Sequence, residues 1–341
     1  MGSRRHALIR AGLSWGTWAL ASGGLGACAW MGPQGGSPSG HSGGHPPEGQ
    51  GYEAATGRPL DPTAWQARLA QADVLLLGER HDNALHHTLR GRWIAALPHA
   101  QVVAEHLPQG GTVVWPTAPN LPEQQEAPSG PREAAWLAAL TAAGFEPQAW
   151  GWPLHQGLMA PLAQAGVPVR GGNLPRALAR RIAREGEAAL PPALAASLAR
   201  APLSGGALAS LQAALVQGHC GQLPVARLPA MVAAQRARDA AMGQSLLAAW
   251  DAGARPAVLV AGNGHVRTDW GVPVWLRAQR PGLRVLSVVM SEVGEGESNH
   301  PLPGTLPPQA PGSEGAAADL LWLAPAPAGR EDPCQGLNLP R

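Results

Sequence analysis

The chain has 341 residues, of which 45% are hydrophobic, so it can form a substantial core in one large domain or two medium ones. Its 25 basic residues nearly balance 23 acidic ones, which leaves a formal net charge of +2 without any run of like charge. These features argue against a disordered or fibrous protein. They also argue against nucleic acid as the main partner.

The first 27 residues have the pattern of a lipoprotein signal peptide. Three arginines precede a weakly apolar stretch, residues 11–25, which is too short and too rich in glycine for a good membrane span. Small residues stand just before Cys28, so we expect this cysteine to be lipidated and to become the mature N-terminus. The alternative is an ordinary secretory signal with an unrelated cysteine. The segment Ser3-Arg4-Arg5 resembles a twin-arginine export signal.

The residues after Cys28 indicate where the anchor lies and how it is joined to the domain. Ala29, rather than Asp, follows the cysteine, which predicts an outer-membrane lipoprotein facing the periplasm. Residues 28–60 are rich in Gly, Pro and Ser, and predict a flexible tether. In that oxidising compartment a disulfide between Cys220 and Cys334 is permitted, but the sequence does not show that the two cysteines meet.

Residues 61–329 predict a single α/β domain with a largely parallel sheet that helices cover on both faces. Apolar runs of strand length alternate there with helical stretches rich in Ala and Leu. The expected strands are residues 73–78, 101–105, 167–170, 257–262, 284–289 and 320–323. The expected helices are residues 83–96, 131–143, 154–165, 175–189, 207–216 and 228–250. Residues 109–131 and 294–317 predict surface insertions, and residues 330–341 a polar C-terminal tail.

Polar side chains follow three of the expected strands. Ligands of open α/β sheets bind outside the carboxyl ends of the strands, so we search these positions first. The residues found there are Glu79, His81 and Asp82, then Glu105, and finally Asn263 and His265. Carboxylate and imidazole together suit a divalent metal, and imidazole also suits haem iron. We therefore expect Glu79, His81, Glu105 and His265 to form the main site.

The last long helix, residues 228–250, carries two polar residues on its inward face. At about 100° per residue, Gln235 and Asp239 lie on the same side as Met231 and Leu246. A buried Asp needs a partner. Asp239 therefore has two equal alternatives. It either supports the site, or it pairs with a neighbouring arginine or with backbone donors at a helix end.

The remaining histidines divide into inward and peripheral groups. His86 has the spacing of an inward residue next to His87, so it either reaches the site or completes the packing. His99, His106 and His300 predict surface or loop positions, although His106 adjoins Glu105 and stays a reserve candidate.

The sequence gives no support to two other kinds of chemistry. It contains no Gly-x-Ser-x-Gly segment, so a nucleophilic serine is not indicated. Its glycine-rich segments match neither the dinucleotide-binding fingerprint nor a Walker loop, so nucleotide binding is not indicated.

Several of these segments, in this order, resemble the ChaN-like haem-binding lipoproteins of iron uptake. The resemblance rests on residues 75–87, 102–105, 148–154, 172–176, 235–242, 261–273 and 332–334. It implies a lipid-anchored α/β domain that binds haem at a subunit interface, hence as a homodimer, and that serves haem and iron acquisition.

The family is related to the TIKI metalloproteases, the TraB proteins and the erythromycin esterase-like hydrolases. On that relation the alternative function is a metal-dependent hydrolase with a divalent ion as its cofactor. His81, His265 and a carboxylate would hold the ion and lower the pKa of a bound water, and the remaining carboxylate, Glu105 or Glu79, would be the general base.

One residue departs from the family pattern. His155 stands where the family commonly has a tyrosine that can ligate ferric haem, and Tyr52, the only tyrosine of the chain, falls in the predicted tether. The axial haem ligand is therefore expected to be one of five histidines: His81, His86, His87, His155 or His265. Arg176, near a strand end, is expected to neutralise a propionate or to be an ordinary surface residue.

Overall fold

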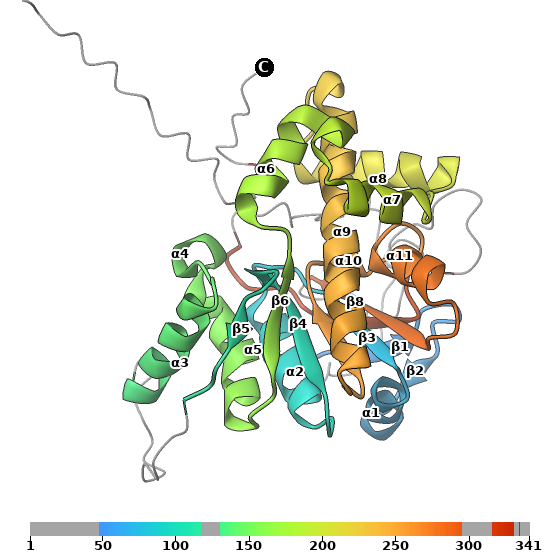
Figure 1. The fold of residues 1–341 in the computed structure, drawn as a ribbon. Helices are drawn as coiled ribbons and strands as arrows, with labels where there is room; N and C mark the ends of the chain where they lie inside the picture. The colour runs from blue at the N-terminus through green and yellow to red at the C-terminus, as the bar shows by residue number, and fades with distance from the viewer. Residues whose placement is uncertain (1–47, 117–129, 295–315, 331–333, 335–341) are drawn as a thin grey trace, which may run out of the picture.

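The computed structural model describes residues 48–116, 130–294, 316–330 and 334. Within them, nine strands form one mixed sheet in the order β2-β1-β9-β8-β3-β7-β4-β6-β5 (Figure 1). The six neighbouring strands from β9 to β6 are parallel, whereas β1, β2 and β5 pair antiparallel at the two edges. The predicted α/β class with a largely parallel sheet is therefore confirmed.

Each apolar run that predicted a strand forms one. The strands are β1 (Gln50–Glu53), β2 (Pro59–Leu60), β3 (Val74–Leu77), β4 (Gln101–Pro108), β5 (Thr112–Val113), β6 (Val169–Asn173), β7 (Ala257–Val260), β8 (Val285–Val293) and β9 (Leu320–Pro325). The central strands β3 and β7 are buried along their whole length. Strands covered on both faces require continuous apolar runs, which explains why the sequence signal was clear there.

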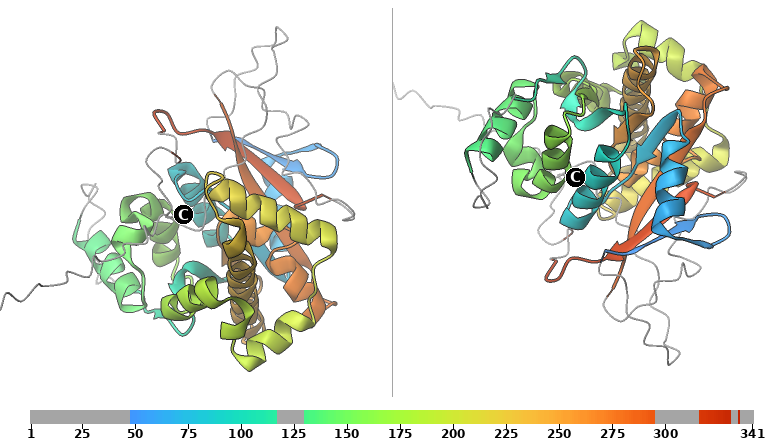
Figure 2. Two further views of the ribbon diagram at one scale, coloured as in Figure 1. Left: turned by 90° about the horizontal axis from the view of Figure 1, so that it is seen from above. Right: turned by 90° about the horizontal axis from the view of Figure 1, so that it is seen from below.

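Helices cover the two faces of the sheet in separate layers. The helices are α1 (Pro62–Ala70), α2 (Ala84–Ala95), α3 (Pro131–Ala142), α4 (Pro147–Trp150), α5 (Trp152–Gln164), α6 (Arg176–Glu185), α7 (Pro192–Ala199), α8 (Gly205–Gly218), α9 (Leu228–Asp251), α10 (Asn263–Val266) and α11 (Val272–Gln279). In Figure 1, α9 crosses in front of the strands and α2 and α5 lie behind them, and the two views of Figure 2 show the same separation.

Two large apolar clusters, one on each side of the sheet, form most of the core, and a smaller third cluster lies between α8 and α9. Side chains of α9 pack with Leu76 and Leu259 on one face, and side chains of α2 and α5 pack with Leu75 and Leu77 on the other. Alternate residues of β3 thus serve opposite faces. The close approach of α9 to β6 leaves no room for a side chain at Gly172, because a Cβ there would lie 2.5 Å from Val103 and 3.2 Å from Met242.

The sheet begins earlier in the chain than the sequence analysis predicted. Strands β1 and β2 lie in the part of residues 28–60 that we assigned to the tether, so that prediction is wrong for residues 50–60. Tyr52 is 2% exposed and belongs to the core cluster on the α9 face. The strand is too short to stand out in a glycine-rich context, and its burial comes from pairing with β9, far away in the sequence. Residues 28–47 and the signal peptide lie outside the described residues.

Smaller elements were also missed. Strand β5 lies within the predicted insertion 109–131, and the short helices α1, α7 and α11 were not expected. The rest of that insertion, and most of residues 294–317, lie outside the described residues. No helix among the described residues has both the length and the apolar character that crossing a bilayer would require.

A disulfide and a salt-bridge network attach the C-terminal tail to the domain. Cys220 after α8 is bonded to Cys334, 114 residues away in the sequence. Arg330 pairs with Glu292 of β8 and lies 2.8 Å from Asp82 in the loop after β3. The question that the sequence left open for the two cysteines is thus answered by a bond.

We expect a chain that begins at residue 48 to be as stable as the full chain, and one that begins at residue 61 to be less stable. The shorter chain lacks β1 and exposes the surface that Tyr52 buries, which is worth at least about 2 kcal/mol. Urea unfolding of both chains measures the difference. Equal midpoints would contradict the assignment of β1 to the folded domain.

Candidate functional site

Three neighbouring strands bring polar side chains to one edge of the sheet. Strands β3, β7 and β4 lie side by side and run parallel, so their carboxyl ends meet. Glu79 follows β3, Glu105 and His106 lie near the end of β4, and His265 lies in α10 directly after β7. Gly78 permits the close approach of this last connection, because a Cβ there would lie 2.3 Å from Asn263 Oδ1.

Glu79 is a buried carboxylate surrounded by cationic and imidazole groups. It forms an ion pair with the fully buried Arg90 of α2. Its Oε1 accepts a hydrogen bond from His81 Nδ1 at 2.6 Å and lies 3.4 Å from His106 Nε2, and its Oε2 lies 3.0 Å from His87 Nδ1. A buried carboxylate requires such partners, because burial without them would cost several kcal/mol.

His155 of α5 completes a group of potential ligands with Glu79, His81 and His106. One ligand atom from each of the four residues lies within 4.8 Å of the others. The rings of His106 and His155 have centroids 4.6 Å apart, and Trp150 of α4 contacts both His81 and His106. The position that departs from the family pattern thus points into the protein interior.

The imidazoles of this group are neutral at physiological pH. Burial lowers the pKa of His81, His106 and His155, and it lowers the pKa of His87 to about 4. A neutral imidazole keeps a lone pair on one nitrogen, which is the form that binds metal ions. Burial also lowers the pKa of Arg90 to about 9, which leaves its guanidinium charged beside Glu79.

A second, charged group lies next to the first. Glu105 pairs with Arg238 of α9 and accepts a hydrogen bond from the backbone N–H of Gly262 at 2.8 Å. His265 lies between two carboxylates, with Nε2 3.4 Å from Glu105 and Nδ1 2.6 Å from Asp239. The two groups approach each other at His81 and Glu105, where Nε2 of His81 lies 4.0 Å from Oε2 of Glu105.

Electrostatics fix the charges of the second group. Burial favours a neutral Glu105, but the positive charges of His265 and Arg238 outweigh burial and hold the pKa of that carboxyl well below its usual range. Burial likewise opposes a charged His265, but Glu105 and Asp239 raise its pKa to about 9. His265 is therefore an imidazolium that donates from both nitrogens and offers no lone pair to a metal in this state.

The structure divides the four main residues that the sequence analysis grouped together. Glu79 and His81 belong to the neutral imidazole group, together with His106 and His155. Glu105 and His265 form the adjacent ion-pair group.

The other expected residues have separate roles. Gln235 and Asp239 both contact His265, as a site-supporting role predicts. The side-chain amide of Asn263 donates to Met290 O and its Oδ1 accepts from Met290 N, so Asn263 joins the end of β7 to β8. His86 is buried away from the group, accepts from the backbone N–H of Arg80, and has its pKa lowered to about 3 by burial.

Two expected residues lie at the protein surface. Asp82 has a half-exposed side chain and pairs with Arg330. Arg176 is also exposed and pairs with Glu146, the residue before α4.

His106 is the functional candidate that the sequence analysis misplaced. It is buried in β4, not on the surface or in a loop. Glu105 contacts α9 and His106 contacts α5, because consecutive strand residues point to opposite faces of the sheet. The apolar Leu107 after it was the available signal that the strand continued. Arg90, buried in α2, was also missed, since an arginine in a helical stretch normally faces solvent.

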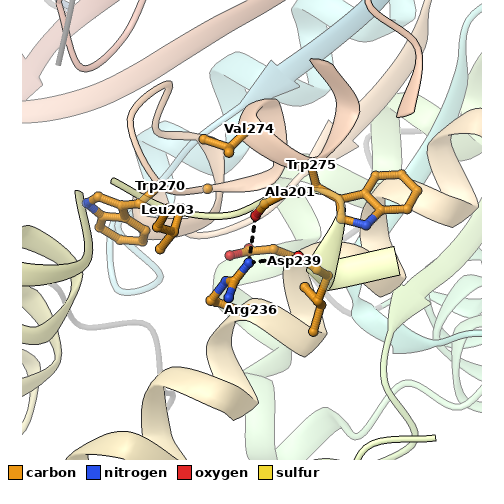
Figure 3. A pocket seen from close by; sticks show the side chains of 9 residues that line it. Ala201, Leu203, Arg236, Asp239, Trp270, Val274 and Trp275 are labelled. Carbon is orange, nitrogen blue, oxygen red and sulfur yellow. Dashed lines mark hydrogen bonds between the residues drawn. The ribbon is translucent and has the colours of Figure 1, made fainter. Parts of the chain in front are cut away.

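A small pocket lies behind the ion-pair group. It is lined by Leu203, Trp270 and Val274, among others, and reaches Asp239 beside Arg236 (Figure 3). Arg236 donates to the carbonyl of Ala201 at 2.6 Å. The pocket has a volume of about 10 Å³, room for about one water molecule, so it does not accommodate a porphyrin.

The fold and the site define an α/β protein with a buried histidine and carboxylate centre at the carboxyl ends of a parallel sheet. The model of the family described as "Haem-binding uptake, Tiki superfamily, ChaN" matches residues 65–276. The chain therefore belongs to this ChaN family of haem-binding uptake proteins, as the resemblance of the motifs indicated.

One solved structure agrees with this assignment at the level of the fold. The structure described as "Cofacial heme binding to ChaN of Campylobacter jejuni" matches 82% of this chain and 97% of its own, with 16% identity and a TM-score of 0.56. The type III effector HopBA1 matches 77% of this chain and 92% of its own, with 12% identity and a TM-score of 0.37, which is too low to support an argument. No curated protein matches the chain.

We expect His265→Gln to lower the free energy of unfolding by an amount that depends on pH. Because the folded state raises the pKa of His265 to about 9, its charge stabilises the protein fully below a pH of about 6.5. This contribution, on the order of 3 kcal/mol, is lost as the pH rises through about 9. Urea unfolding of both proteins at about pH 6 and pH 10 measures it.

The matched control is His219→Gln, because His219 follows α8 and lies outside the candidate site. A difference between wild type and His265→Gln that stays constant from about pH 6 to pH 10 would show that His265 is neutral in the folded protein.

Proposed function

We propose that this chain is a lipid-anchored haem-binding protein of haem and iron acquisition. The observation that carries the proposal is the family match over residues 65–276, which spans both groups of the candidate site. Imidazole is a common axial ligand of haem iron, and ring contacts join four histidines of the candidate site, His81, His87, His106 and His155.

The structure favours one axial ligand among the five expected histidines. The side chains of His86, His87, His155 and His265 are almost completely buried, so a porphyrin cannot approach them. The side chain of His81 is 17% exposed. Its Nε2 faces Gly262, where a Cβ would lie only 2.8 Å away, so ligation requires the ring to turn outward. His81 is therefore the residue we assign to haem iron.

The surface next to His81 has the chemistry that a porphyrin needs. The ring centroids of Trp150 and His81 lie 5.4 Å apart. Leu154, at the start of α5, is 38% exposed. An indole and an aliphatic side chain can cover the flat apolar face of the ring. Arg176 pairs with Glu146, the residue before α4, the helix that carries Trp150. When haem binds, Arg176 would pair with a propionate in place of Glu146. When bound, haem would supply the iron that the protein carries.

The place and assembly of the protein form part of this proposal. Lipidation of Cys28 would hold the domain at the outer membrane, facing the periplasm. The disulfide between Cys220 and Cys334 supports an oxidising compartment. The Campylobacter jejuni relative binds haem cofacially. At one haem per chain, a stacked pair of haems would come from two copies of this chain. We propose a homodimer whose interface covers the haem on the surface near α4.

We expect haemin to titrate the protein to one haem per chain, with a saturable shift of the Soret absorbance. His81→Ala should lower the affinity by roughly tenfold or more, because the axial bond is lost. His99→Ala, on the exposed turn after α2, is the control that should titrate like the wild type. A His81→Ala protein with wild-type affinity would refute the ligand, and non-saturating absorbance in the wild type would refute haem binding.

The lipid anchor has a separate test. Cells that express the chain should incorporate radiolabelled palmitate into the wild type, and Cys28→Ser should abolish the label, because the sulfur of that cysteine carries the lipid. Cys220→Ser is the control and should remain labelled, because in the wild type the sulfur of Cys220 is bonded to Cys334 and carries no lipid. Label in Cys28→Ser would show that Cys28 is not the site of lipidation.

A further inference from the structure

We propose that Glu79, His81, His106 and His155 bind a divalent first-row transition metal ion inside the protein, with the His81 ring in its inward position rather than turned toward the haem surface. The inference goes beyond the proposed function, because it concerns an ion held by side chains rather than by a porphyrin. It also uses a different set of residues from the Glu79, His81, Glu105 and His265 set that the sequence predicted.

The spacing of the four ligand atoms is close to that of a metal site. They lie within 4.8 Å of one another, whereas ligands of a tetrahedral ion with bonds of about 2.1 Å lie about 3.4 Å apart. Small rotations of buried rings suffice to close that difference. Three imidazole nitrogens and one carboxylate oxygen are the ligands that zinc, iron and related divalent ions take in proteins.

Two of the four ligands, His106 and His155, have ring nitrogens without partners among the described residues. His155 Nε2 and both ring nitrogens of His106 are buried without a hydrogen bond. Leaving a buried polar atom unpaired costs about 1–3 kcal/mol each, so native proteins rarely do so without a reason. A metal ion would bond several of these atoms at once.

Neighbouring groups orient the ligands as they do in known metal sites. His155 Nδ1 faces the carbonyl of Gly151 at 3.5 Å, which leaves the lone pair on Nε2 pointing into the group. Glu79 is held by Arg90, whose guanidinium also donates to Nδ1 of His87, and His87 Nε2 donates to the carbonyl of His81. Such outer contacts fix the tautomer and the direction of the ligating side chains.

Charge sets the expected strength of binding. The guanidinium of Arg90 neutralises Glu79 and repels a cation, so the ion meets no net negative charge in the group. We therefore expect weaker binding than at a structural zinc site made of thiolates, and an ion that chelators remove without unfolding the protein.

The first experiment titrates the full chain, free of haem and stripped by a chelator, with cobalt(II). We expect one ion per chain and the visible absorbance of cobalt(II) with nitrogen and oxygen ligands. His106→Gln and His155→Gln should each lower the affinity at least tenfold, and His219→Gln should leave it unchanged. Wild-type affinity in both cluster variants, or no saturable binding in the wild type, would overturn the proposal.

A second measurement does not depend on the variants being folded. X-ray absorption of the zinc-loaded wild type should show nitrogen and oxygen neighbours with the outer scattering of at least two imidazole rings. A spectrum without imidazole scattering would overturn the assignment. Both experiments keep His81 unchanged and use no haem, so a failed haemin titration would leave this inference standing, and the reverse also holds.

Discussion

The burial of Glu79 is the constraint on which the rest of the site depends. A carboxylate at the end of a central strand, closed off from solvent, must be paired, and Arg90 of α2 provides the charge. That pairing fixes the position of α2 against the sheet and leaves the remaining volume around Glu79 to His81, His87 and His106. The imidazoles stay neutral because burial penalises their charged form and Arg90 has already compensated the carboxylate.

The two groups of the site perform different tasks because their charges differ. Glu105, Arg238, His265 and Asp239 alternate in sign and form a rigid connection between β4, α9 and α10. Alternating charges satisfy each other and leave little capacity for a ligand. The imidazole group, in contrast, has one balanced ion pair and several unused nitrogens. The charged group therefore joins β4, α9 and α10 beside the imidazole group.

The sequence predicted the parts of this protein whose signal is local. Runs such as residues 74–77 and 257–260 are apolar throughout because helices cover both faces of the strands, and the polar residues that follow them mark the edge where the site forms. Features that depend on distant pairing were not predicted. Tyr52 is buried by β9, and His106 is buried by α5, and neither partner can be inferred from its neighbours in the sequence. Likewise, the sequence placed Glu105 and His265 near His81 and offered support of the site as one role of Asp239, but it did not indicate that Arg238 pairs with Glu105.

The pairing of β1 with β9 means that the first and last strands of the described domain are neighbours. This antiparallel contact spans some 270 residues, so it forms late, because β1 cannot pair until β9 has been synthesised. Until then β1 lacks this partner. The order of folding is thereby tied to the order of synthesis: the segment nearest the predicted anchor waits for the C-terminal strand before it becomes part of the sheet.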